Sequence, residues 1–258
     1  MRFSTILHSA VSLSLVLTVG QCVFTTGAVA QGQPEPTGKL VITDDFQRSS
    51  LVDDQHSWVT NDQRAKRTSK QDAATFQPQV QLVDGIMRVV RTEGSDHAAT
   101  ARLSGRFGDA VCRVKFRLQA GDKFSFNFND PGLKKTVHAG HVCKVEISTS
   151  QLTLQDQMNG TMDLKIRQMR LEDPKSPQVA RRTEATTKRF KTKVAPDQWH
   201  ALEIRIRGPI LTVSIDGQER GSFESPGFGH PTKENIAFSV PRRLEVDELR
   251  VWALASEE

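Results

Sequence analysis

The stretch DQWHALEIRIRGPILTVSIDGQERGSF, residues 197–223, decides the fold of this 258-residue chain. Apolar Leu202, Ile204 and Ile206 alternate with charged residues, and a second alternating run begins after position 209. Alternation with a period of two and many β-branched side chains predicts strands with one buried and one solvated face. Asp216 and Gly217 supply the positive φ values of a tight hairpin turn. The stretch therefore predicts an antiparallel meander in an all-β sandwich.

The segment from residue 198 to residue 252 also resembles a known group of domains. The resemblance is carried by QWHALEIRIRG, by LTVSIDGQERGSFESPGFGHPTKENI and by the closing VDELRVWAL. These runs are similar to the last strands of concanavalin A-like (laminin G-like) jelly rolls. Among these, the chain resembles secreted planctomycete-type proteins related to the DUF1080 or 3-keto-disaccharide hydrolase domain. An opening DDF followed by Trp58 is also typical of that family. The resemblance implies a two-sheet antiparallel jelly roll.

Other parts of the chain repeat the strand pattern, and one part interrupts it. Strands are expected at 40–46, 79–83, 86–91, 97–103, 110–118, 124–128, 142–148, 152–157, 235–240 and 244–252, giving eleven to thirteen in total with the central meander. Phe124, Phe126 and Phe128 share one face of their strand and are expected in the core. Residues 161–171 and 178–186 predict a short helical excursion over one edge or mouth of the sandwich. Residues 61–72 are too polar for a core and predict a surface loop.

The N-terminal residues predict export. Arg2, an apolar run at residues 10–19 and the small residues Ala28 and Ala30 form the pattern of a secretory signal peptide, residues 1–30. Gln21 stands where a small residue would precede a lipid-bearing cysteine, which argues against lipid attachment at Cys22. We expect a linker at 31–38, one sandwich domain at 39–254, and a secreted or periplasmic protein after cleavage near Ala30. No other segment predicts a membrane span.

Charge and cysteine content limit the classes of partner and the chemistry. Removing residues 1–30 takes away only Arg2, so the formal net charge falls from +5 to +4, because 5 − 1 = 4. That mild excess, with no tyrosine in the chain, argues against nucleic-acid binding. Cys112 and Cys143 are expected on inward positions of one sheet, about 10 Å apart, and therefore as two free buried thiols.

Two histidines three residues apart suggest one possible metal site. His138 and His141 could ligate zinc if Asp130 or Asp156 converged on them. The favoured interpretation is a turn whose histidines accept or donate hydrogen bonds, with His230 fixing a loop in the same way. No cofactor is predicted.

Carboxylates are plentiful, but their pattern does not predict a glycosidase, which needs two of them about 5–10 Å apart. Asp130, Glu146, Asp156 and Glu203 are the candidates on polar positions, and no E-x-D-x-x-E run joins any of them. The resembled hydrolases tend to carry Asn-Ser-Gly before an arginine in mid-domain, where this chain has FNDPG at 128–132.

The remaining use of a polar sandwich face is to bind sugar. The residues expected to contribute are Asn127, Asn129, Asp130, His138, His141, Glu146, Asp156, Trp58 and Arg205. The sequence therefore predicts a carbohydrate-directed binding module, with a carbohydrate or glycoconjugate as partner and no catalytic centre of its own. A glycoside hydrolase of the 3-keto-disaccharide type and a structural domain of the cell envelope are the two alternatives.

Overall fold

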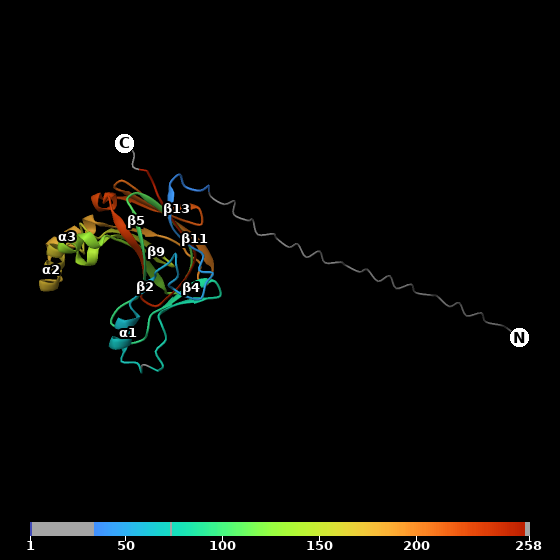
Figure 1. Cartoon of the computed structure of the whole chain (residues 1–258). Helices are drawn as coiled ribbons and strands as arrows, with labels where there is room; N and C mark the ends of the chain where they lie inside the picture. Colours follow the sequence, from blue (N-terminus) through green and yellow to red (C-terminus); the bar gives the residue numbers. More distant parts are fainter. Residues whose placement is uncertain (2–33, 73, 256–258) are drawn as a thin grey trace. The chain divides into compact units, whose positions relative to one another are not determined.

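The computed structural model describes residue 1 and residues 34–72 and 74–255. The predicted signal peptide, Cys22 and the first residues of the predicted linker lie outside these residues. The described residues from 35 onward form one compact unit, in which two antiparallel sheets are stacked around one core (Figure 1). Among the described residues, no helix has the length and apolar character needed to cross a membrane. The fold is the predicted jelly-roll sandwich.

The first sheet has the strand order β13-β12-β11-β6-β15-β4-β3, with β1 also paired to β15. Its strands are β1 (Lys39–Asp44), β3 (Val80–Val83), β4 (Ile86–Val90), β6 (Ala110–Arg117), β11 (Trp199–Arg207), β12 (Ile210–Ile215), β13 (Gln218–Glu224) and β15 (Arg243–Ala253). Strand β15 is long enough to pair with β4 near its start and with β1 near its end, where Ala253 lies opposite Lys39.

The second sheet has the strand order β10-β9-β8-β7-β14-β5-β2. Its strands are β2 (Val59–Thr60), β5 (Ala99–Phe107), β7 (Lys123–Asn129), β8 (His141–Ser148), β9 (Gln151–Asp156), β10 (Thr187–Lys191) and β14 (Lys233–Val240). The described part of the chain thus contains fifteen strands, more than the eleven to thirteen expected.

The core lies between the inner faces of the two sheets. Phe124, Phe126 and Phe128 are completely buried, as predicted, and the ring of Phe126 meets that of Phe238 edge-on at 5.1 Å between centroids. Leu202, Ile204 and Ile206 face them from the first sheet and are also buried, in agreement with the meander read from the sequence. Burial of one such side chain stabilises the fold by about 1.5–3 kcal/mol.

The predicted helical excursion is confirmed as α2 (Leu164–Glu172) and α3 (Pro177–Ala185), which lie beside each other in Figure 1. Helix α2 begins later than expected because Asp163 caps it, its Oδ1 accepting a hydrogen bond from the Ile166 backbone N–H at 3.0 Å. Three short 3-10 segments complete the fold: η1 (Pro131–Lys135), η2 (His138–Gly140) and η3 (Pro226–Gly229).

One local prediction was wrong, and one strand was not predicted. The expected surface loop at 61–72 contains helix α1 (Asp62–Ser69), whose one buried residue, Ala65, gives no apolar stripe that a sequence pattern could reveal. The basic run after α3 forms strand β10 at the edge of the second sheet. There Phe190 is the side chain that packs inward, against Gly221 of β13.

Cys112 and Cys143 are free and buried, as predicted, but their arrangement differs from the expectation. Cys112 lies on β6 of the first sheet and Cys143 on β8 of the second, so they approach the core from opposite sides. Burial raises the pKa of both thiols, that of Cys143 to about 12, and both are protonated at neutral pH.

Candidate functional site

The outer face of the second sheet brings together several of the residues predicted to bind. We use "outer face" for the side chains of β5, β14, β7, β8, β9 and β10 that point away from the core. Strand register aligns them in rows across the sheet. One row runs Arg102, Ala237, Asn127, Lys144, Gln155 and Thr187. The next runs Thr100, Ser239, Ser125, Glu146, Thr153 and Arg189, and Lys123, Ser148, Gln151 and Lys191 lie in a third.

Short polar side chains form the floor of this face. Ser125, Asn127 and Thr153 are only 5–7% exposed although they point away from the core. Asn127 Nδ2 donates hydrogen bonds to the backbone oxygens of Ala237 at 3.1 Å and of Ser125 at 3.2 Å, which fixes its amide. In the described part of the chain, the Thr153 hydroxyl and the Gln155 amide make no side-chain hydrogen bond, so both remain available to a ligand hydroxyl.

Glu146 is the one carboxylate in these three rows. Its oxygens accept hydrogen bonds from Lys123 Nζ at 3.2 Å, Lys144 Nζ at 3.3 Å and Ser125 Oγ at 3.4 Å. Burial alone would raise the pKa of Glu146, but the two ammonium groups outweigh it and hold the pKa below its usual value. Glu146 is therefore an anion at neutral pH, which suits an acceptor of hydrogen bonds and not a general acid.

A second polar cluster lies at the ends of β7 and β8. Asn129 Nδ2 donates to Asn235 Oδ1 at 2.8 Å, and Asn129 Oδ1 lies 2.7 Å from Nδ1 of His141. Burial, followed by the charges of His138 and Lys144, lowers the pKa of His141 to about 4, so its ring is neutral. Asn129 and His141 are thereby held in fixed orientations at one end of the outer face.

The zinc hypothesis finds no support in this cluster. Asp130 Oδ1 accepts a hydrogen bond from the Gly132 N–H at 2.7 Å, and its Oδ2 lies 2.8 Å from Nε2 of His230. The rings of His138 and His141 are 6.5 Å apart between centroids. Within residues 34–72 and 74–255, no group of three or more His, Cys, Asp or Glu side chains could hold a metal ion.

Asp156 does not reach the outer face. It is buried, and its Oδ2 accepts hydrogen bonds from Ser225 Oγ at 2.6 Å and from the Gly227 N–H at 2.8 Å. Its Oδ1 accepts from the Asn159 N–H at 3.0 Å. Asp156 therefore holds η3 and the turn after β9 in place.

Trp58 and Arg205 also lie elsewhere. Trp58 is 3% exposed, donates from Nε1 to Asp44 Oδ2 at 2.8 Å and stacks on Phe238 in the core, so its ring is not available to a sugar. Arg205 points outward from the first sheet and pairs with Glu203 at 3.0 Å. Of the nine predicted residues, the outer face itself therefore brings together Asn127, Asn129 and Glu146, with His141, His138 and Asp130 at its end.

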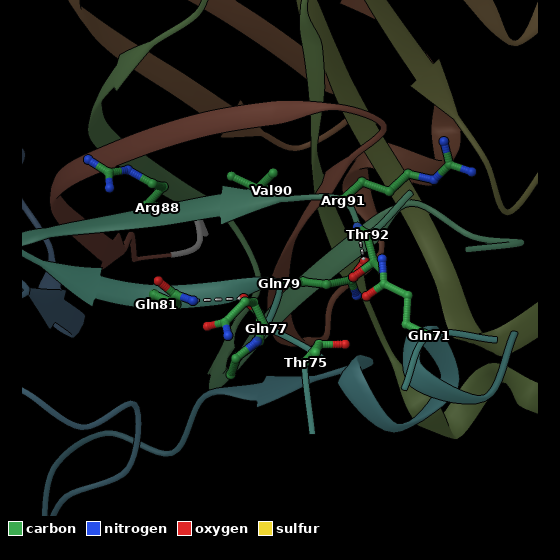
Figure 2. Close-up of a pocket in the computed structure, with 10 residues that line it drawn as sticks. Gln71, Thr75, Gln77, Gln79, Gln81, Arg88, Val90, Arg91 and Thr92 are labelled. Atoms are coloured by element: carbon green, nitrogen blue, oxygen red, sulfur yellow. Dashed lines mark hydrogen bonds between the residues drawn. The ribbon is translucent and has the colours of Figure 1, made fainter. Parts of the chain in front are cut away.

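A separate hollow of about 290 Å³ lies beside β3 and β4, and the sequence reasoning did not identify it (Figure 2). Glutamines 71, 77, 79 and 81 line it together with Arg91 and Thr92. Gln79 is fixed, since its Oε1 accepts from the Thr92 N–H at 2.9 Å and its Nε2 donates to Asn61 Oδ1 at 3.0 Å. Glutamine at every second position from 77 to 81 was the signal that could have revealed it.

No protein-family model matches the chain, and no curated protein sequence matches it. Solved structures do share its fold. An endo-β-galactosidase from Clostridium perfringens that releases GlcNAcα1-4Gal superposes with a TM-score of 0.56 at 10% identity, over 86% of this chain and 65% of that one. This chain thus spans less than two thirds of that enzyme.

The superposition of this chain on two glucanases covers almost the whole length of each glucanase. An endo-β-1,3-glucanase from Pyrococcus furiosus gives a TM-score of 0.52 at 11% identity, over 85% of this chain and 96% of that one. A β-glucanase from Bacillus licheniformis gives 0.52 at 12% identity, over 85% and 100%. At these identities the likeness establishes the concanavalin A-like jelly-roll fold.

Proposed function

We propose that this protein is an exported carbohydrate-binding module without a catalytic centre of its own, and that it holds sugar on the outer face of the second sheet. The observation that carries the proposal is the setting of Glu146. It is a single carboxylate, paired with Lys123 and Lys144, on a floor of short hydrogen-bonding side chains. The pattern of residues 1–30 supports export.

The chemistry of the floor suits sugar hydroxyls. Hydroxyl and amide groups both donate and accept hydrogen bonds, and the carboxylate accepts them. Those of Ser125, Asn127 and Glu146 are already fixed by neighbouring groups. Fixed polar groups lose little entropy when a ligand arrives, which favours affinity. The solved structures that share the fold include enzymes named for acting on galactosides and glucans, which supports a carbohydrate ligand.

Hydrolysis by either common route needs a second carboxyl group about 5–10 Å from the first. The three rows of the outer face contain no partner for Glu146 among the residues that the structure describes. The lysines also keep Glu146 ionised, whereas a general acid needs a raised pKa. We therefore assign binding to this face.

The test applies the full chain to a glycan array and then measures release of reducing ends from every glycan that binds. We expect binding to at least one class of glycan and no release. If the protein binds no glycan on the array, the proposal is overturned and a structural or interaction domain of the cell envelope is favoured. Release from a bound glycan or from a 3-keto-disaccharide, lost in Glu146→Gln, would instead favour a glycoside hydrolase.

A further inference from the structure

The outer face of the second sheet carries an excess of positive charge. Its three rows contain five cationic side chains and one carboxylate; the cations are Arg102, Lys123, Lys144, Arg189 and Lys191. Lys123 and Lys144 share Glu146. Arg102, Arg189 and Lys191 are exposed, and each lacks an ion-pair partner among the described residues.

The first sheet handles its positive charge differently. On its outer face Arg113 and Arg205 pair with Glu203, and Arg88, Arg117 and Arg243 share Glu245. Lys115 pairs with Glu248. Six cations of the first sheet are therefore partnered within the protein, and Arg250, which lies opposite Arg113, has no ion-pair partner among the described residues. On the second sheet, three of the five cations are left for something outside the protein.

Helix α2 adds charge next to the same face. Arg167 and Arg170 lie close enough to His138, in the segment just before β8, to contribute to the lowering of its pKa, after burial as the larger cause. His138 is next to His141, which contacts Asn129 on the outer face. Two further cationic side chains, those of Arg167 and Arg170, thus lie near that end of the face.

We propose that the outer face binds an anionic polysaccharide, one whose sugar residues carry carboxylate or sulfate groups. This inference rests on the proposed carbohydrate-binding function and specifies its ligand. Arg102 lies on β5 and Arg189 on β10, five strand spacings apart, which corresponds to about 24 Å across the sheet. Charges spread over that width match an extended chain crossing the strands. The neutral floor between them meets the hydroxyl groups of the same chain.

The test compares two variants with equal charge changes. The first, Arg102→Gln, Arg189→Gln and Lys191→Gln, removes the unpartnered cations of the outer face. The second, Lys115→Gln, Arg205→Gln and Arg243→Gln, removes three cations from the first sheet and is the matched control. The replaced side chains lie on the surface, with Arg205 and Arg243 half-buried and the others exposed, so both variants are expected to fold, which thermal unfolding checks.

Affinity is measured for the full chain against two pairs of probes: polygalacturonate with its methyl-esterified form, and dextran sulfate with dextran. We expect the wild type to bind at least one anionic probe more tightly than its neutral counterpart, with affinity that falls as salt rises. Three exposed charge contacts correspond to about a tenfold to hundredfold loss in the outer-face variant. The control variant should change much less. The two pairs distinguish carboxylate from sulfate recognition.

Each way in which the proposal could be wrong gives a different experimental result. Equal binding of charged and neutral probes overturns the anionic ligand but leaves the carbohydrate-binding function standing. Equal losses in both variants show that charge acts without a defined site and overturn the assignment to this face. No binding to any glycan removes both proposals. Tighter binding to duplex DNA than to every glycan, lost in the outer-face variant, would identify a nucleic-acid surface instead.

Discussion

Replacing Asp44 by asparagine should destabilise the protein strongly, because this carboxylate is buried at the junction of β1, the following loop and Trp58. Its oxygens accept hydrogen bonds from the Phe46 N–H at 2.8 Å, from Arg48 at 2.5 and 2.9 Å, and from Trp58 Nε1 at 2.8 Å. The Asp44→Asn change removes the charge that Arg48 faces and turns one acceptor oxygen into a donor.

Breaking a buried ion pair by removing one partner costs about 3–5 kcal/mol. For a domain of this size, each 1 kcal/mol corresponds to about 2–4 °C in Tm, so we expect a fall of about 6–20 °C. Urea unfolding followed by tryptophan fluorescence measures the change in free energy. Asp45→Asn is the matched control, because Asp45 is exposed and accepts only local hydrogen bonds.

The effect of Asp44 should also depend on pH. Burial alone would raise the pKa of Asp44, but the hydrogen bonds from Arg48, Trp58 and the Phe46 backbone outweigh it, so the pKa lies below its unfolded value of 3.8. The stabilisation is therefore complete above pH 3.8 and is lost as the pH falls through the lower folded value. The difference between wild type and Asp44→Asn should shrink in that acid range. A destabilisation below about 1 kcal/mol at pH 7 would refute the reasoning.

Three further predictions test other parts of the structure. Arg205→Ala should change the free energy of unfolding by no more than about 0.5 kcal/mol, since the side chain points outward; a fall of several degrees in Tm would contradict this. Gly227→Ala should cost about 1–3 kcal/mol in urea unfolding, because its Cβ would lie 2.1 Å from Oδ1 of buried Asp156; unchanged stability would disprove that packing. His141 has a folded pKa of about 4 against 6.5 when unfolded, so its stabilisation is present above pH 6.5 and lost as pH falls towards 4. Between pH 7 and pH 5, the free energy of unfolding of His141→Gln should therefore fall less than that of the wild type. An equal fall in both proteins would contradict a buried, neutral His141 ring.

The sheet pattern could be predicted wherever strands have one buried and one wet face. Leu202, Ile204 and Ile206 alternate without interruption, and the structure buries all three. The edge strand β10 was not predicted because Phe190 is its one side chain that packs into the core, and basic residues fill three of its five positions. Helix α1 was not predicted for a similar reason, since Ala65 is its one buried residue. Alternation of apolar and polar residues indicates a strand with one buried face, so elements that bury few side chains do not show this pattern.

The candidate site was predictable only in part. Polar residues alternating with the core phenylalanines of β7 had to face outward, which placed Asn127 and Asn129 correctly on one face. The sequence could not show that Trp58 points inward, because a tryptophan can serve as core or as a stacking platform and Asp44 decides between them. Nor could it show that β7 and β10 belong to one sheet, which depends on long-range pairing. The shared positive charge of Lys123 and Arg189 therefore became visible only in the fold.

The pairing of Lys39 with Ala253 puts the first and last strands of the sandwich side by side. Both belong to the first sheet, so the polypeptide enters and leaves the sandwich at neighbouring points on the layer opposite the polar rows. A fusion partner or a surface attached directly before Lys39 or directly after Ala253 would therefore lie on the first-sheet side. Such an attachment would leave the second sheet's strands open to a long polymer approaching from solution.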